Sequence, residues 1–207
     1  MNSQAQHWID SINWDKVGGL IPGIIQHHRT GQVLMLGYLS PESIEKTLAT
    51  GLVTFFSRSR QQLWTKGETS GHTLELVDLA LDCDVDTLLI QANPNGPTCH
   101  KGITSCFGEH PPPQVGFLAT LDALIRARTS AAPDTSYTAR LLNEGVDRCA
   151  QKVGEEGVEV ALAAVSQSTE ALLEESADLI YHLLVLLRAK NLELDDAIAV
   201  LQQRHSD

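Results

Sequence analysis

The hydrophobic and polar positions follow two different patterns in the two halves of the chain. In the first half, β-branched or alternating apolar residues form short runs bounded by Gly, Pro or Asn, which is typical of strands. These runs are residues 32–38, 52–57, 73–81 and 87–92. A short helix is expected after the first run, because Ser40 can cap it, Pro41 fits its first turn and Gly51 can end it. The first half is therefore predicted to be α+β and rich in strands.

In the second half, apolar residues recur at helical spacing instead. Leu118, Leu121 and Ile125 form one such stripe. Further helices are expected over residues 138–165, from Ser168 or Thr169 to about residue 190, and over residues 194–203. The second half is therefore predicted to be an all-α helical bundle.

The change of pattern falls at three consecutive prolines, residues 111–113. Such a run cannot continue a helix or a sheet ladder and favours a stiff spacer. We therefore predict a first domain of residues 1–110, a proline-rich linker of residues 111–117 and a second domain of residues 118–207. A chain of 207 residues is long enough for two domains.

The charge balance narrows the classes of partner. The sequence has 26 acidic and 15 basic residues, a formal net charge of −11, which argues against a nucleic-acid partner because such proteins need a basic face. No apolar run is long enough to span a bilayer, and the polar beginning does not look like a signal peptide. A cytoplasmic protein without a membrane partner is expected, and in that compartment clustered cysteines suggest metal binding or catalysis before disulfides.

Three cysteines of the first half, Cys83, Cys99 and Cys106, are candidate zinc ligands. Thiolates bind zinc strongly, and three protein ligands leave the fourth position for a water that zinc can activate. The alternative is three small buried residues. His100 has two interpretations: it is a fourth ligand, which would make the site structural, or it is a nearby general base.

Asp82, Asp84 and Asp86 alternate along the chain. If this stretch is extended, all three carboxylates point to one face, where Mg²⁺ could offset their repulsion. A solvated strand face is the alternative. A nearby stretch with glycines contains basic and hydroxyl side chains that can bind phosphate, although a solvated hairpin tip has the same composition. Its candidate substrate-binding residues are Arg58, Arg60, Lys66, Thr69 and Ser70.

In the second half, two predicted helices carry acidic residues spaced three or four apart, so that each helix has an acidic face. These residues are Glu155, Glu156 and Glu159 in one helix, and Glu175 and Asp178 in the next. If the two helices are antiparallel, their carboxylates can meet and bind Mg²⁺. The alternative is a pair of ordinary solvated faces.

Residues 55–71, 82–86 and 99–107 together resemble the phosphoribosyl-AMP cyclohydrolases of histidine biosynthesis. The resemblance implies a homodimer with active sites between subunits. It implies that Cys83, Cys99 and Cys106 bind zinc, with Cys83 reaching the metal of the partner chain, and that the three aspartates bind Mg²⁺. It also makes His100 a base or proton shuttle.

The pairs Glu156-x-x-Glu159 and Glu175-x-x-Asp178 resemble the all-α nucleotide pyrophosphohydrolases, a family that includes phosphoribosyl-ATP pyrophosphohydrolase. Residues 137–142 and 151–159 look like the histidine-pathway members. This resemblance implies Mg²⁺ bound by the five acidic residues in some combination, helices assembled across a dimer, and phosphate held by Lys152.

The two resemblances together imply a bifunctional hydrolase. Its second domain would convert phosphoribosyl-ATP to phosphoribosyl-AMP and pyrophosphate, with Mg²⁺ neutralising the triphosphate. Its first domain would then open the adenine ring of phosphoribosyl-AMP with zinc-activated water. The alternative is a less selective nucleoside-triphosphate pyrophosphohydrolase fused to a structural zinc module.

Overall fold

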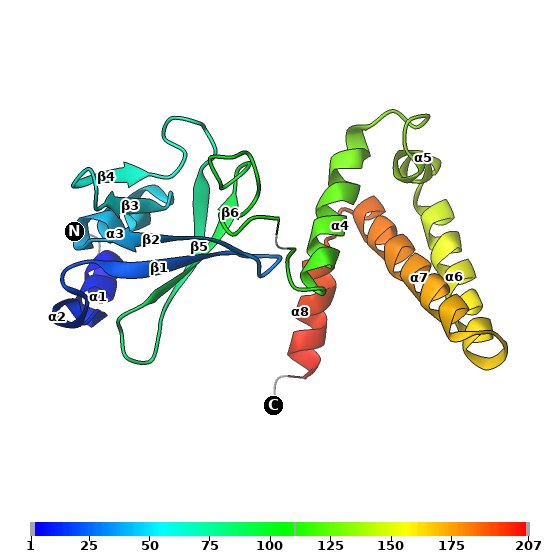
Figure 1. Cartoon of the computed structure of the whole chain (residues 1–207). Coiled ribbons are helices and arrows are strands. Elements are labelled where there is room, and N and C mark those ends of the chain that lie inside the picture. The colour runs from blue at the N-terminus through cyan, green and yellow to red at the C-terminus, as the bar shows by residue number, and fades with distance from the viewer. Residues whose placement is uncertain (1–2, 110, 206–207) are drawn as a thin grey trace. The chain divides into compact units, whose positions relative to one another are not determined.

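A computed structural model describes residues 3–109 and 111–205 of the chain. The chain forms two compact units, Met1–Phe117 and Leu118–Asp207 (Figure 1). The first unit contains the strands and the second is helical, as the hydrophobic pattern predicts. Three of the predicted domain ends, Met1, His110 and Asp207, lie outside the described residues.

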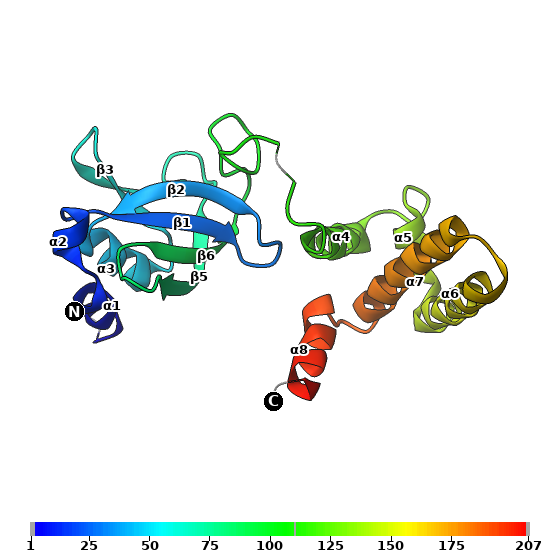
Figure 2. The same ribbon diagram turned by 60° about the horizontal axis from the view of Figure 1, so that its bottom comes forward.

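The first unit is built on a sheet of four strands in the order β2-β1-β6-β5, beside a separate ribbon of β3 and β4 (Figure 2). Its strands are β1 Ile21–His27, β2 Val33–Leu39, β3 Thr54–Ser57, β4 Gln62–Thr65, β5 Leu74–Leu81 and β6 Leu88–Pro94. Its helices are α1 Ser3–Ser11, α2 Trp14–Val17 and α3 Pro41–Thr50. Strand β1 runs antiparallel to β2 and parallel to β6, and β6 runs antiparallel to β5.

The core of the first unit lies on one face of this sheet. Ile25 of β1 and Ile90 of β6 are paired in register and fully buried, as is Phe55 of β3. Burying each side chain of this size stabilises the fold by roughly 1.5–3 kcal/mol. Gly37 of β2 allows Phe55 to approach closely, because a Cβ at position 37 would lie 2.3 Å from the phenyl ring. Ser40 caps α3 through the amide of Ser43, as the sequence predicts.

The sequence pattern missed two strands of this unit. Strand β1 begins Ile21-Pro22-Gly23, and Pro and Gly read as strand breakers. Pro22 is tolerated because the parallel pairing with β6 begins only at Gly23, so its missing N–H costs no bond in that ladder. Strand β4 lies in the stretch that was interpreted either as a phosphate-binding segment or as a solvated hairpin tip.

The segment predicted as a spacer packs on the first unit. The three prolines line a pocket of about 610 Å³ together with Gly31 of the β1–β2 turn, Val33 at the start of β2 and Phe107. Gly116 lies against the same turn, because a Cβ there would meet the carbonyl oxygen of Thr30 at 2.1 Å. The prolines therefore contribute to the first unit instead of only separating two units.

The second unit consists of helices. They are α4 Gly116–Ala127, the 3-10 helix η1 Arg128–Ser130, α5 Tyr137–Glu144, α6 Val146–Ser166, α7 Thr169–Ala189 and α8 Leu194–Arg204. Helices α6 and α7 run antiparallel and side by side (Figure 1). The core joins buried residues of four helices, among them Ile125, Leu141, Cys149 and Leu184. In the described residues, no helix has both the length and the apolar character needed to cross a membrane.

The prediction of one helix over residues 138–165 is wrong. Helix α5 ends at Glu144 and α6 begins at Val146, because Gly145 adopts φ 97° and ψ 176°. This conformation is open to glycine and strained for residues with a Cβ. The break leaves α5 as a separate helix that begins with Tyr137.

Candidate metal centres

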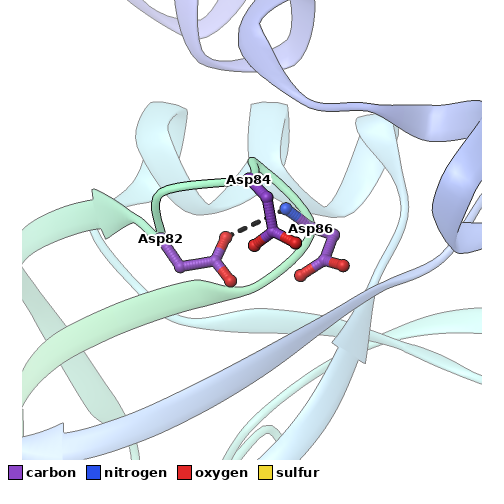
Figure 3. Close-up of side chains that lie close together, drawn as sticks. All are labelled: Asp82, Asp84 and Asp86. Atoms are coloured by element: carbon purple, nitrogen blue, oxygen red, sulfur yellow. Dashed lines mark hydrogen bonds between the residues drawn. The ribbon is translucent and has the colours of Figure 1, made fainter.

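The three aspartates meet in the turn between β5 and β6. One carboxylate oxygen of each lies within 4.8 Å of the others, and Figure 3 shows the side chains pointing toward one another. The stretch is a turn and not an extended strand as the alternation suggested, since Val85 has a φ of 54°. The Asp82 carboxylate stabilises the turn by accepting hydrogen bonds from the amides of Asp86 and Thr87 at 2.9 and 3.0 Å.

A lysine that sequence reasoning missed balances this acidic cluster. The ammonium of Lys16 in α2 contacts the carboxylate of Asp84 and lies 2.6 Å from that of Asp86. Hydrogen bonds to these two carboxylates raise the pKa of Lys16, and the same contact lowers the pKa of Asp84. The cluster thus accepts a cation. Lys16 lies 68 residues from Asp84 in sequence, so no local spacing could have paired them.

A second group of candidate residues lines a pocket of about 580 Å³ in the first unit. Cys99, His100 and Cys106 are found there. Four of the predicted substrate-binding residues line the same pocket: Arg60, Lys66, Thr69 and Ser70. Arg58 does not line it, because its guanidinium lies over the ring of Tyr38, with the guanidinium carbon 3.7 Å from the ring centre.

The two cysteines of this pocket are neighbours. Burial, followed by the charge of the Cys99 thiol and a hydrogen bond to it, raises the pKa of Cys106. The sulfur of Cys99 lies 4.0 Å from Nδ1 of His100. Burial lowers the pKa of Lys66, whose ammonium donates a hydrogen bond to the carbonyl of His72 at 2.9 Å. The pocket therefore combines two adjacent thiols, an imidazole and a cation.

Cys83 is remote from this pocket within one chain. It lies in the turn before Leu88, whereas Cys99 follows the other end of β6 at Pro94. At a rise of about 3.3 Å per residue, β6 separates the two ends by roughly 20 Å. A single copy therefore brings together two of the three predicted zinc ligands.

In the second unit, paired helices bring three carboxylates together. Oxygens of Glu156 in α6 and of Glu175 and Asp178 in α7 all lie within 4.8 Å of one another. Glu156 is only 3% exposed. Glu155 faces Lys152, with 3.0 Å between the ammonium and a carboxylate oxygen. A hydrogen bond to Glu156, then the charges of neighbouring carboxylates, raises the pKa of Glu159.

Two further side chains contact Glu156. The ammonium of Lys152 lies 2.6 Å from its Oε1, and Nε2 of His182 lies 3.6 Å from the same oxygen. The hydrogen bond from Lys152 lowers the pKa of Glu156, whereas burial lowers the pKa of His182 and favours a neutral imidazole. Sequence reasoning missed His182, although it lies four residues after Asp178 and thus on the same helix face.

Comparison with known families assigns a class to each unit. The family model of phosphoribosyl-AMP cyclohydrolase matches residues 35–108, which include the thiol pocket and the aspartate turn. The family model of phosphoribosyl-ATP pyrophosphohydrolase matches residues 118–205, which include the helical carboxylate cluster. The protein is thus a bifunctional hydrolase.

Similar proteins are bifunctional proteins of histidine biosynthesis. The chain is 56% identical over 198 residues to the histidine biosynthesis bifunctional protein HisIE of Vibrio vulnificus, covering 95% of this chain and 94% of the relative. It is 56% identical over 194 residues to the HisIE protein of Escherichia coli, covering 94% of this chain and 95% of the relative. The chain belongs to this family of bifunctional histidine-biosynthesis proteins.

Proposed function

We propose that the chain catalyses two consecutive hydrolyses of histidine biosynthesis. The second unit converts phosphoribosyl-ATP to phosphoribosyl-AMP and pyrophosphate, and the first unit opens the adenine ring of phosphoribosyl-AMP. The observation that carries the proposal is the separate clustering of carboxylates in the second unit and of thiols in the first. The two family matches favour it over an unselective triphosphatase fused to a structural zinc module, because each names a histidine-pathway activity.

In the second unit, the carboxylates of Glu156, Glu175 and Asp178 are spaced to hold Mg²⁺. When bound, Mg²⁺ supplies positive charge that offsets the charge of the triphosphate. Lys152 binds a phosphate oxygen, with its ammonium already directed to this site by Glu156. Glu159, which lies beside Glu156 on α6, takes a proton from the attacking water. The bond between the α- and β-phosphates breaks, and pyrophosphate leaves.

In the first unit, Cys99 and Cys106 provide two thiolates for zinc, and Cys83 of a second copy provides the third. Zinc at this position supplies a Lewis acid that makes a water nucleophilic near neutral pH. His100 lines the pocket and moves the proton that this water loses. Arg60 and Lys66 line the same pocket as the thiols and hold the phosphate of the substrate.

The aspartate turn is proposed as an Mg²⁺ site of the first unit. Three carboxylates whose oxygens lie within 4.8 Å of one another suit an oxygen-binding divalent cation. Lys16 contacts Asp84 and Asp86, so Mg²⁺ bound there would replace its ammonium at these two carboxylates.

A homodimer is proposed because the helical unit leaves apolar side chains uncovered. Val158, Leu162 and Val165 recur at helical spacing along α6 and are 60%, 52% and 82% exposed. Leu173 and Ile180 of α7 are exposed as well. An apolar face of this kind is typical of an association surface. A second copy of the helical unit would cover it.

The direct test supplies phosphoribosyl-ATP to the whole chain and follows pyrophosphate and the ring-opened imidazole carboxamide product together. We expect both products with zinc and Mg²⁺ present, and pyrophosphate without ring opening after zinc is removed. Full ring opening by zinc-free protein would contradict the assignment of the thiol pocket. Equal turnover of phosphoribosyl-ATP and ordinary nucleoside triphosphates would favour the unselective alternative.

A further inference from the structure

A small basic pocket lies where α5 meets the beginning of α6. It has a volume of about 290 Å³. Its lining residues are Tyr137, Arg140, Leu141, Glu144 and Arg148. Two guanidinium groups against one carboxylate leave one net positive charge, in a chain whose formal net charge is −11. None of the three candidate metal centres described above accounts for this pocket.

The two arginines of this pocket differ in their partners. Arg148 contacts two carboxylates, with Nε 3.6 Å from Glu144 and Nη1 3.5 Å from Glu155. Arg140 is exposed and, within the described part of the chain, has no carboxylate partner. Its guanidinium carbon lies 5.3 Å from the centre of the Tyr137 ring. Arg148 therefore offsets the charge of Glu144, and Arg140 remains available for an anion.

Two chains of side-chain contacts link the basic pocket to the carboxylate cluster. On one side, Arg148 touches Glu155, which also lies 3.0 Å from Lys152. On the other side, the Tyr137 ring lies 5.9 Å from the ring of His182, whose Nε2 is 3.6 Å from Glu156. One extended ligand could therefore occupy both places at once.

The substrate has two separate anionic ends. Phosphoribosyl-ATP differs from an ordinary nucleoside triphosphate by a second, phosphorylated ribose on N1 of the adenine. The carboxylate cluster with Lys152 suits the triphosphate end, so the remaining phosphate needs a cation away from it. A guanidinium binds phosphate through paired donors, and an adjacent aromatic ring can lie against a sugar or a base.

We propose that Tyr137, Arg140 and Arg148 form the subsite for the N1-linked phosphoribosyl group, and that this subsite selects phosphoribosyl-ATP over ordinary nucleoside triphosphates. The inference rests on the proposed pyrophosphohydrolase function and names the residues that give it selectivity. Tyr137 begins the stretch that resembles histidine-pathway enzymes in particular, and Gly145 keeps its helix separate from α6.

The test measures pyrophosphate release by the whole chain carrying Arg140→Ala, Arg140→Lys or the control Arg204→Ala. Arg204 is an exposed arginine in the last turn of α8. Because a charge-assisted contact with phosphate is lost, Arg140→Ala should raise KM for phosphoribosyl-ATP by about 10- to 100-fold with a smaller change in kcat. Arg140→Lys should fall between Arg140→Ala and the unchanged protein, and Arg204→Ala should leave KM within about twofold.

Competition by two probes shows which end of the substrate the pocket binds. Ribose 5-phosphate should inhibit the unchanged protein and lose at least about 10-fold in potency on Arg140→Ala, whereas ATP should inhibit both equally. A KM for Arg140→Ala equal to that of Arg204→Ala would overturn the proposal, as would a parallel loss of inhibition by ATP. Failure of the unchanged protein to release pyrophosphate from phosphoribosyl-ATP would instead overturn the proposed function itself.

Discussion

In the helical unit, Glu156, Glu175 and Asp178 already meet within one chain, whereas in the strand-rich unit Cys83 and Cys99 lie at opposite ends of β6. An antiparallel helix pair brings positions from two helices together at one level along their axes. In a strand, by contrast, the distance between the two ends grows by about 3.3 Å for every residue. The carboxylate cluster is therefore a property of one copy, but the thiol site as proposed requires two.

The candidate metal ligands of the two units also differ in how their negative charge is offset. In the helical unit, Lys152 contacts Glu156 of the carboxylate cluster and the neighbouring Glu155. In the aspartate turn, Lys16 reaches the carboxylates from a distant helix. In the thiol pocket, burial is the chief cause that raises the pKa of Cys106. Metal loss should therefore affect the two reactions independently.

The largest expected effect separates the two reactions. Cys99→Ser removes a zinc ligand, so ring opening should fall by more than about a thousandfold because the water is no longer activated. Pyrophosphate release should stay within about twofold, since Cys99 belongs to the other unit. Zinc content and both products are measured on the same sample. Cys149→Ala is the control, because Cys149 is a buried residue of the helical core, and it should keep its zinc.

A variant of the helical unit should impair pyrophosphate release and leave ring opening intact. Glu175→Gln keeps the shape of the side chain and removes a charge from the carboxylate cluster, so pyrophosphate release should fall by about a hundredfold and more Mg²⁺ should be needed. Ring opening of added phosphoribosyl-AMP should be unchanged. Glu174→Gln, an exposed neighbour outside the cluster, is the matched control. Equal activity of the two variants would remove Glu175 from the ligand set.

Much of both carboxylate clusters could be predicted from the sequence, because their residues lie in short motifs. Five acidic residues at helical spacing predicted a shared face, and Glu156, Glu175 and Asp178 do meet. The convergence of Asp82, Asp84 and Asp86 was expected on a strand but occurs in a turn with Val85 at φ 54°. Side-chain alternation could not reveal this, because a left-handed backbone position at valine depends on the surrounding turn.

What the sequence did not reveal depends on the tertiary fold. Lys16 contacts Asp84, and His182 contacts Glu156. In each contact the two residues belong to different elements, so their spacing in the sequence does not reveal that they meet. Gly145 was overlooked as a helix break because the apolar spacing continues across it. Cys83 was a candidate ligand because it lies in the same half as Cys99 and Cys106, and the family resemblance implied that it acts on the partner chain. Its distance from Cys99 appears only once β6 is placed.

A mixing experiment tests whether the thiol site needs two copies. Cys83→Ser and Cys99→Ser should each be inactive in ring opening when alone. If Cys83 binds the zinc held by the partner chain, a mixed dimer keeps one complete site of its two. That site takes Cys99 from the Cys83→Ser chain and Cys83 from the Cys99→Ser chain. Because random exchange makes about half of the dimers mixed, the mixture should recover about a quarter of full activity. No recovery after verified subunit exchange would show that Cys83 acts within its own chain or not at all.

The smallest expected effect comes from separating the two units. Each contains its own core, one around Ile25, Ile90 and Phe55 and the other around Ile125 and Leu184. Fragments of residues 1–117 and 118–207 should therefore each fold and keep their own reaction to within a few-fold of the whole chain. Circular dichroism reports the fold, and the two product assays report activity.

The place of the cut decides how much stability is lost. Ending the first fragment after residue 110 removes the prolines that line the pocket with Gly31 and Val33, and removes Gly116 from its place against Thr30. That shorter fragment should lose about 1 kcal/mol of unfolding free energy relative to residues 1–117, because apolar surface of the β1–β2 turn becomes exposed. Urea unfolding of both fragments measures the difference. Equal stability would mean that the prolines act only as a spacer, and inactivity of both 1–117 and 118–207 would mean that the two units depend on each other.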